Sequence, residues 1–204
     1  MEFAPVTLEG RWARLEPLTR QHAEGLLAAA ADETIWRWMP TRLTTIEEVR
    51  AWIGTALAAR ATGTELPFAI VDRERGEVVG STRFMEIQAA HRGVEIGWTW
   101  LGRDARRTPI NTECKYLLLR HAFEAWECLR VQLKTDRRND RSRRAIERIG
   151  GQFEGIHRNH RVLPDGTVRD TAFYSIVERE WPGVKAWFEG RLDRTSCEET
   201  RMPV

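Results

Sequence analysis

The chain has little of what marks a membrane protein, a secreted protein or a nucleic-acid-binding protein. Its 204 residues carry 32 Lys and Arg against 30 Asp and Glu, and the net charge of +2 is too small to predict bulk binding of nucleic acid. No apolar run is long enough to span a bilayer, and we find neither a signal peptide nor a lipidation motif. We therefore expect a cytoplasmic protein without a membrane or nucleic-acid partner.

Cysteine is also scarce. The three cysteines, Cys114, Cys128 and Cys197, are odd in number and lack the spacing of a metal site. Free thiols in a reducing compartment are the simplest interpretation, and no metal site is expected.

What the chain does contain is typical of a globular protein. A hydrophobic share of 42% and a charged share of 30% suit one domain with a proper core. We expect this domain to cover residues 1–193, followed by a polar and disordered tail over 194–204. Nine tryptophans are unusual for this length, and several lie in segments that can line a groove.

Local patterns predict alternating strands and helices. In chain order we expect a strand over 8–18, a helix after Thr19, a helical turn over 32–40, a helix from the capping box of Thr45 and Glu48, a hairpin around Arg75-Gly76, strands over 92–101 and 129–136 with a helix after each, a hairpin turning at Pro164-Asp165-Gly166, and a helix from Trp181 to about Leu192. This order predicts a mixed sheet with helices on both faces. The turn after the 92–101 strand contains no glycine beyond Gly102, which argues against a Rossmann domain.

The segment from Arg92 to Ile149 is the most informative. Its first strand delivers a basic turn, GRDARRTPI, onto the start of a helix. The first amides of a helix have no partner within the helix, and the aligned peptide dipoles add a partial positive charge there, so this junction suits a phosphate. A second strand and a second helix, which opens at Asn139 and Ser142, follow directly. Together they predict a phosphorylated cofactor held between two strand–helix units.

Four sequence blocks in this order resemble the GNAT acetyltransferase family, and its branch of ribosomal-protein N-terminal alanine acetyltransferases in particular. They are EIGWTW, RRTPINTE, KTDRRNDRSRRAIERIGG and FEGIHRNHRVLPDGTVRDTAFYSIVEREW. The resemblance covers about Val6 to Leu192. It implies a mixed α/β (α+β) fold with a largely antiparallel sheet of about seven strands, splayed at the centre. It also implies transfer of an acetyl group from acetyl-CoA to a primary amine, by direct attack in a ternary complex.

The resemblance also implies which residues hold the cofactor. The free backbone of the first strand, at Trp98, Thr99, Trp100 and Leu101, would pair with the amide-bearing arm of CoA, with Gly97 as a bulge or point of close approach. Arg106, Arg107 and the turn through Thr108, Ile110, Asn111 and Thr112 would bind the diphosphate. The family's commonest pattern has two glycines in this turn, and we place Pro109 and Asn111 at those positions. Pro109 suits a helix start with Thr108 as the cap, but it lacks an N–H.

Asn139 and Ser142 look like the family's polar pair at the second helix. Asn139 would hydrogen-bond the CoA arm, or serve only as a helix cap, and Ser142 would lie near the leaving sulfur, or be an ordinary first-turn serine. A strand N–H between Trp98 and Trp100 would stabilise the oxyanion. For the general base we prefer Glu95, which period two places on the face opposite Trp98, with Glu86, His157 and His160 as rivals. Glu95 can equally be a half-buried carboxylate paired with an arginine.

The acceptor amine is expected to enter beside the turn that holds Trp36, Trp38 and Met39 and the 157–168 hairpin, with Glu86 and His160 also near it. Either a protein N-terminus or a small amine would fit. The main alternative function is a non-catalytic CoA-binding sensor, and a third is nucleic-acid binding through the arginines of 137–148. A homodimer is implied by the resemblance alone.

Overall fold

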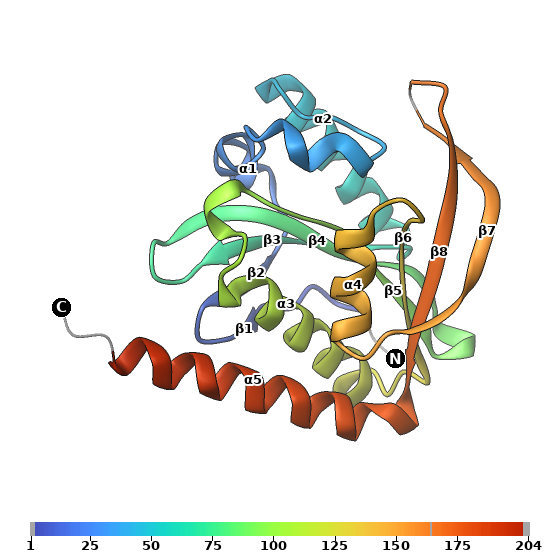
Figure 1. The fold of residues 1–204 in the computed structure, drawn as a ribbon. Coiled ribbons are helices and arrows are strands. Elements are labelled where there is room, and N and C mark those ends of the chain that lie inside the picture. Colours follow the sequence, from blue (N-terminus) through green and yellow to red (C-terminus); the bar gives the residue numbers. More distant parts are fainter. Residues whose placement is uncertain (1–2, 164, 202–204) are drawn as a thin grey trace.

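The computed structural model describes residues 3–163 and 165–201 and has one eight-stranded sheet (Figure 1). Along the sheet the strands follow the order β1-β2-β3-β4-β5-β6-β8-β7, and every neighbouring pair is antiparallel except β5 and β6. The strands are β1 (Leu8–Glu9), β2 (Ala13–Pro17), β3 (Leu66–Asp72), β4 (Glu77–Gln88), β5 (Gly93–Leu101), β6 (Arg130–Asp136), β7 (Gln152–Val162) and β8 (Val168–Val177). The predicted mixed and largely antiparallel sheet is confirmed.

Helices cover both faces of the sheet (Figure 1). One face carries α3 (Pro109–Arg120), α4 (Asp140–Arg148) and α5 (Trp181–Arg201), whose residues Leu117, Ile146 and Phe188 share a core with strand residues such as Phe68 and Val131. The other face carries α1 (Ala23–Ala29), the 3-10 segment η2 (Glu33–Trp38) and α2 (Ile46–Ala61), which build a second core with Trp100 and Ala69. The face under α1 and α2 is called the acceptor face below.

The two parallel strands separate after a short contact. β5 and β6 pair only at Gly93–Arg130, Val94–Val131 and Glu95–Gln132. β6 is paired with β8 along its whole length, whereas the edge of β5 that faces β6 has no strand partner from Ile96 to Leu101 within the described residues. The predicted splay is therefore present, and it exposes backbone donors and acceptors on one side of β5.

A bulge in β5 changes which way its tryptophans point. Trp98 has a left-handed backbone, with φ of 50°, and the register with β4 shifts at this place. Arg83 lies opposite Gly97 and therefore shares a face with Glu95, and its guanidinium lies 5.0 Å from the Trp98 ring centroid. The expectation that Glu95 and Trp98 lie on opposite faces is wrong, because the bulge interrupts the alternation of period two.

The N-terminal segment is held to α3 by one buried carboxylate. Glu113, 4% exposed, accepts hydrogen bonds of 2.7 Å from the backbone N–H groups of Arg11, Trp12 and Ala13. These donors lie where the strand expected over 8–18 breaks into β1 and β2. Glu113 thus satisfies a turn whose backbone would otherwise be unpaired in the interior.

The last helix is longer than the sequence indicated. α5 continues past Leu192 to Arg201, so the expected disorder of 194–204 is wrong for residues 194–201. The hydroxyls of Thr195 and Ser196 donate to the carbonyls of Arg191 and Leu192, one helical turn earlier, so these polar side chains fit within the helix.

Two further predictions can be compared with the structure. Cys114 and Cys128 are buried and free, as expected, whereas the side chain of Cys197 lies outside the described part, as does Pro164 of the predicted turn. Among the helices described, none combines the length and the apolar character needed to cross a membrane.

Candidate active site

The start of α3 faces the open end of the splay. Thr108 is its cap, with Oγ1 accepting from the Ile110 amide at 3.3 Å, and Pro109 occupies the first helical position, as predicted. Arg107 has a left-handed backbone, with φ of 65°, so the residue of the turn that needs glycine-like freedom is Arg107 rather than Pro109 or Asn111. The amides of Arg107 and Thr108 form no hydrogen bond to any described residue, which leaves them available to an anion.

Arg106 points away from this turn. Its guanidinium lies 3.0 Å from Asp32 Oδ2 and donates to Thr34 Oγ1 and to the carbonyl of Leu101. Burial lowers the pKa of Arg106 and the charge of Asp32 opposes that effect. Arg106 therefore clamps the segment before α2 onto the end of β5, and of the predicted pair only Arg107 has its side chain free of described partners.

The start of α4 holds the predicted polar pair. Asn139 caps the helix, because its Oδ1 accepts from the Ser142 amide at 3.1 Å. Among the described residues no group pairs with Nδ2 of Asn139 or with the Ser142 hydroxyl, and both side chains are half-buried. The cap and a ligand contact are thus compatible, since they use different atoms of Asn139.

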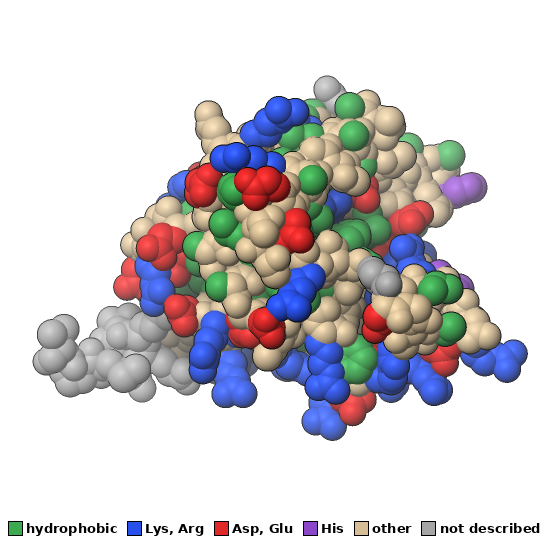
Figure 2. All heavy atoms as spheres, turned by 90° about the horizontal axis from the view of Figure 1, so that it is seen from above, with side chains coloured by type: hydrophobic (Ala, Val, Ile, Leu, Met, Phe, Trp, Pro, Cys, Tyr) green, Lys and Arg blue, Asp and Glu red, His purple; other side chains and the backbone are tan. Residues whose placement is uncertain are grey.

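The arginines of 137–148 divide into two groups. Arg137, Arg138 and Arg143 are held by Asp170, Asp136 and Tyr174. The remaining three, Arg141, Arg144 and Arg148, form no ion pair or hydrogen bond with a described residue. Seen from above, Lys and Arg side chains line the lower rim of the molecule (Figure 2). Arg141 also lies near enough to lower the pKa of Arg106, so the mouth of the splay carries an excess of positive charge.

Glu95 lies where the splay begins. It is 1% exposed, and its Oε2 lies 2.7 Å from Lys134 Nζ and accepts from Gln132 Nε2 at 2.8 Å. Its other oxygen, Oε1, has no hydrogen-bond partner among the described residues and lies against Gly97, where a Cβ would come within 3.0 Å of it. The partner is a lysine rather than the expected arginine, and one carboxylate oxygen remains open beside the bulge.

A lysine reaches the same strand from the helix face. Lys115 of α3 donates to Thr99 Oγ1 at 2.6 Å, and Thr99 also shares a hydrogen bond with Thr82. Desolvation lowers the pKa of Lys115 to about 8. The predicted cofactor strand is thus steadied at Thr99, directly after the bulge.

The tryptophans near the bulge form the wall of the acceptor face. Trp36 is 8% exposed, donates its indole N–H to the Ala30 carbonyl and packs on Trp100 at 5.3 Å, so both are core residues rather than ligand contacts. Trp38 is half-buried and its ring lies 5.2 Å from Arg138, which joins η2 to the end of β6. Met39 packs against the same core. Trp38 is therefore the member of this predicted set that lies at the splay.

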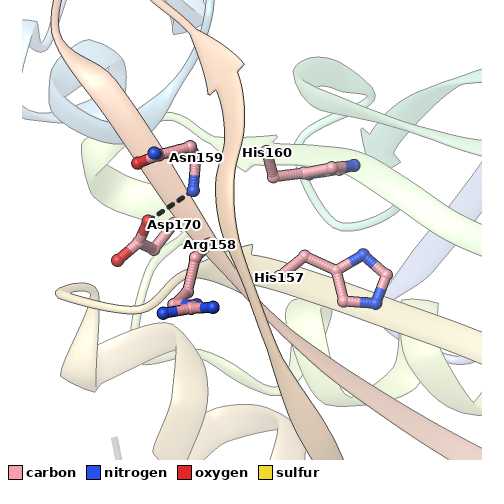
Figure 3. A pocket seen from close by; sticks show the side chains of 5 residues that line it. All are labelled: His157, Arg158, Asn159, His160 and Asp170. Carbon is pink, nitrogen blue, oxygen red and sulfur yellow. Dashed lines mark hydrogen bonds between the residues drawn. The ribbon is translucent and has the colours of Figure 1, made fainter.

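The structure does not bring Glu86 to this place. Glu86 is exposed, with φ of 49°, and lies near the end of β4 that pairs with Gly93, where β5 and β6 are still joined. His160 lies on the other side, where its Nδ1 is 3.0 Å from Thr171 Oγ1. An open hollow of about 920 Å³ is lined by His157, Arg158, Asn159, His160 and Asp170. The two histidines leave β7 in one direction, whereas Arg158 and Asp170 lie in the other, so the hollow wraps around β7 and is not a single cleft (Figure 3).

The comparisons with known proteins agree with this geometry. The family model described as the acetyltransferase (GNAT) domain matches residues 13–152. The structure of a GCN5-related N-acetyltransferase from Brucella melitensis superposes with a TM-score of 0.86 and 34% identity, over 92% of this chain and 85% of that one. A solved acetyltransferase structure from T. thermophilus gives a TM-score of 0.85 and 40% identity, over 94% of this chain and 100% of that one. The chain belongs to the GNAT family and is an N-acetyltransferase that uses acetyl-CoA.

A curated relative bears on the kind of acceptor. The "Putative ribosomal N-acetyltransferase YdaF" of Bacillus subtilis is 32% identical over 110 residues. That match covers 54% of this chain and 59% of YdaF. The likeness to YdaF is thus confined to part of each protein.

Proposed function

We propose that this enzyme acetylates the primary amine of a protein N-terminus or a small molecule by direct attack within a ternary complex. The observation that carries the proposal is the separation of β5 from β6 after three residue pairs, beside the unpaired amides of Arg107 and Thr108. An extended chain of amides can add to the open edge of β5 while an anion binds the turn.

The residues at the splay suit acetyl-CoA. The edge over Trp98, Thr99, Trp100 and Leu101 would pair with its amide-bearing arm, and Asn139 Nδ2 would add a hydrogen bond. The amides of 107 and 108, those of the first turn of α3 over 110–112, and the Arg107 side chain would hold its phosphates. Arg106 is assigned to the acceptor wall instead, because Asp32 and Thr34 occupy its guanidinium.

Bound acetyl-CoA supplies a thioester carbonyl. Around it, the open Oε1 of Glu95 is placed to take a proton from the attacking amine through a water, and an N–H at the Trp98 bulge to donate to the developing oxyanion. The Ser142 hydroxyl, free of described partners, can donate to the departing sulfur. An α-amine, with a pKa near about 8, needs less help than a lysine amine near about 10.4, which favours an N-terminal acceptor.

The test is calorimetry followed by an acceptor screen. CoA should bind with one site per chain, and mass spectrometry should detect acetylation among peptides with varied N-termini, amino acids and polyamines. Failure to bind CoA would rule out the proposal. Tight CoA binding without acetylation of any amine would instead support the sensor.

A further inference from the structure

Arg169 is a buried cation whose terminal nitrogens lack a partner. It lies on β8 and is 9% exposed. Its Nε donates to Thr171 Oγ1 at 3.1 Å, but its two terminal nitrogens form no hydrogen bond or ion pair with any residue of 3–163 or 165–201. They are not among the sealed polar atoms, whereas the unpaired Nε of Arg83 is. A buried guanidinium that keeps an opening to solvent but lacks its counter-charge is suited to an incoming anion.

The strand register places Arg169 on the acceptor face. Thr171 lies opposite Asp136, and Arg169 follows two residues away on the same side of β8. Lys134 lies two residues before Asp136 on that side of β6, and it holds Glu95. Arg169 and the Glu95 carboxylate therefore face the same space, with His160 bonded to Thr171 between the two strands of the hairpin.

The charges in this space do not balance. The nearby carboxylates are taken, Glu95 by Lys134 and Asp136 by Arg138. Burial lowers the pKa of Arg169, and burial together with the charges of Arg161 and Lys134 lowers the pKa of His160. Each effect reflects cations that lie close together without enough anions. The acceptor face near the hairpin is thus electropositive before any ligand arrives.

We propose that Arg169 binds a carboxylate carried by the acceptor, so that the preferred substrates are amines with an acidic group nearby. Thr171 fixes Nε, which leaves the two terminal nitrogens side by side, and this pair matches the two oxygens of a carboxylate. The inference rests on the proposed function, because it concerns the acceptor of that same site.

The test uses the enzyme saturated with CoA, which cannot transfer an acetyl group. Calorimetry then compares matched acceptors: alanine with alaninamide, Ala-Asp-Ala-amide with Ala-Asn-Ala-amide, and Ala-Ala-Asp-amide with Ala-Ala-Asn-amide. The acidic member of at least one pair should bind at least tenfold more tightly, and Arg169→Gln should reduce that ratio to near one. Equal binding within every pair would overturn the inference while leaving the proposed function intact. Failure at the CoA step would remove the proposed function itself.

Three variants separate a specific contact from general charge. Arg158→Gln removes the same charge from the opposite side of β7 and should keep the tenfold ratio. Arg169→Lys should recover only part of it, because an ammonium cannot form the paired contact. Thr171→Val keeps the arginine but removes the hydroxyl that orients it, and should lower the ratio even if Arg169→Gln fails to fold. An equal loss of preference in Arg158→Gln would contradict a local site.

Small anions identify the chemistry of the ligand. Succinate and inorganic phosphate are titrated as inhibitors of acetyl transfer at low acceptor concentration. Succinate should compete with the acceptor in the wild type and lose at least tenfold in potency in Arg169→Gln. Stronger competition by phosphate than by succinate would overturn the choice of a carboxylate.

Discussion

The ammonium of Lys134 lies 2.7 Å from the carboxylate of Glu95, at the point where β5 and β6 part. One oxygen of Glu95 is held there and the other remains open beside Gly97. This arrangement fixes the carboxylate without using all of it, which is what a positioned proton acceptor requires.

Glu95→Gln should lower kcat by about 100-fold at pH 7, the lower end of the usual effect of a general base. The deficit should shrink as the pH rises, because more of the acceptor amine is then neutral without help. Steady-state kinetics between pH 6.5 and 9.5 measure both. Glu86→Gln is the matched control and should leave kcat unchanged, since Glu86 lies at the closed end of the strand pair. A Glu95→Gln enzyme with normal kcat would exclude Glu95 as the base.

The two roles of Asn139 can be separated by substitution. Asn139→Ala should cost about 1 kcal/mol of stability, because the Ser142 amide loses its cap, and should also weaken CoA binding. Asn139→Ser retains a capping oxygen but lacks the Nδ2 donor, so stability should be nearly normal while CoA binds severalfold more weakly. Urea unfolding and calorimetry report the two effects. If Asn139→Ser binds CoA normally, Asn139 is only a cap.

Arg106 and Arg107 are adjacent in sequence but should behave differently. Arg107→Gln should weaken CoA severalfold and reduce the salt dependence of its binding, because an unpaired cation at the phosphate turn is lost. Arg106→Gln should instead raise the KM of the acceptor with little change in CoA affinity, since it releases Asp32 and Thr34 of the acceptor wall. Titrations at two salt concentrations and acceptor kinetics distinguish them. The reverse pattern would contradict the clamp.

Glu113 should be among the most sensitive positions for stability. Glu113→Gln puts an amide group against backbone N–H donors and should lower the free energy of unfolding by about 3 kcal/mol. Glu127→Gln, at an exposed position, is the control and should change it little. Urea titrations of both variants make the comparison. A stable Glu113→Gln would mean that the three hydrogen bonds contribute little.

Lys115 should make the stability depend on alkaline pH. Its pKa is about 8 in the folded chain against 10.5 ordinarily, because of desolvation, so between these values the unfolded chain binds the extra proton. The free energy of unfolding should therefore gain roughly 1–3 kcal/mol from this residue as the pH rises from 8 to 10.5. Comparing Lys115→Met with wild type over this range isolates the gain, and exposed Lys185→Met serves as control. Parallel curves for Lys115→Met and wild type would contradict it.

Features carried by local patterns were predictable from the sequence. The capping box of Thr45 and Glu48, the Thr108 cap with Pro109, and the Asn139 cap all occur as expected, because each depends on residues a few positions apart. The splay of β5 from β6 came from the family resemblance, and it too is present.

Features that depend on contacts between distant segments were not predictable. The reversed face of Trp98 requires a left-handed residue that no glycine announced. The partners of Glu95, Arg106 and Glu113 come from other strands, turns and helices, which a linear pattern does not reveal. Arg169 was missed for the same reason, since its alternation within β8 indicates a face but not the absence of a counter-charge. A buried position for an arginine was the one available signal.

The clamp of Arg106 on Asp32 links the two ends of the reaction. The residue next to it in the chain, Arg107, belongs to the turn proposed for the phosphates, whereas Asp32 leads into η2, where Trp38 lies. Whatever settles that turn must also settle the wall opposite. We therefore expect compulsory order, with the thioester donor entering first, and by reciprocity a firmly seated acceptor slowing the escape of the spent carrier.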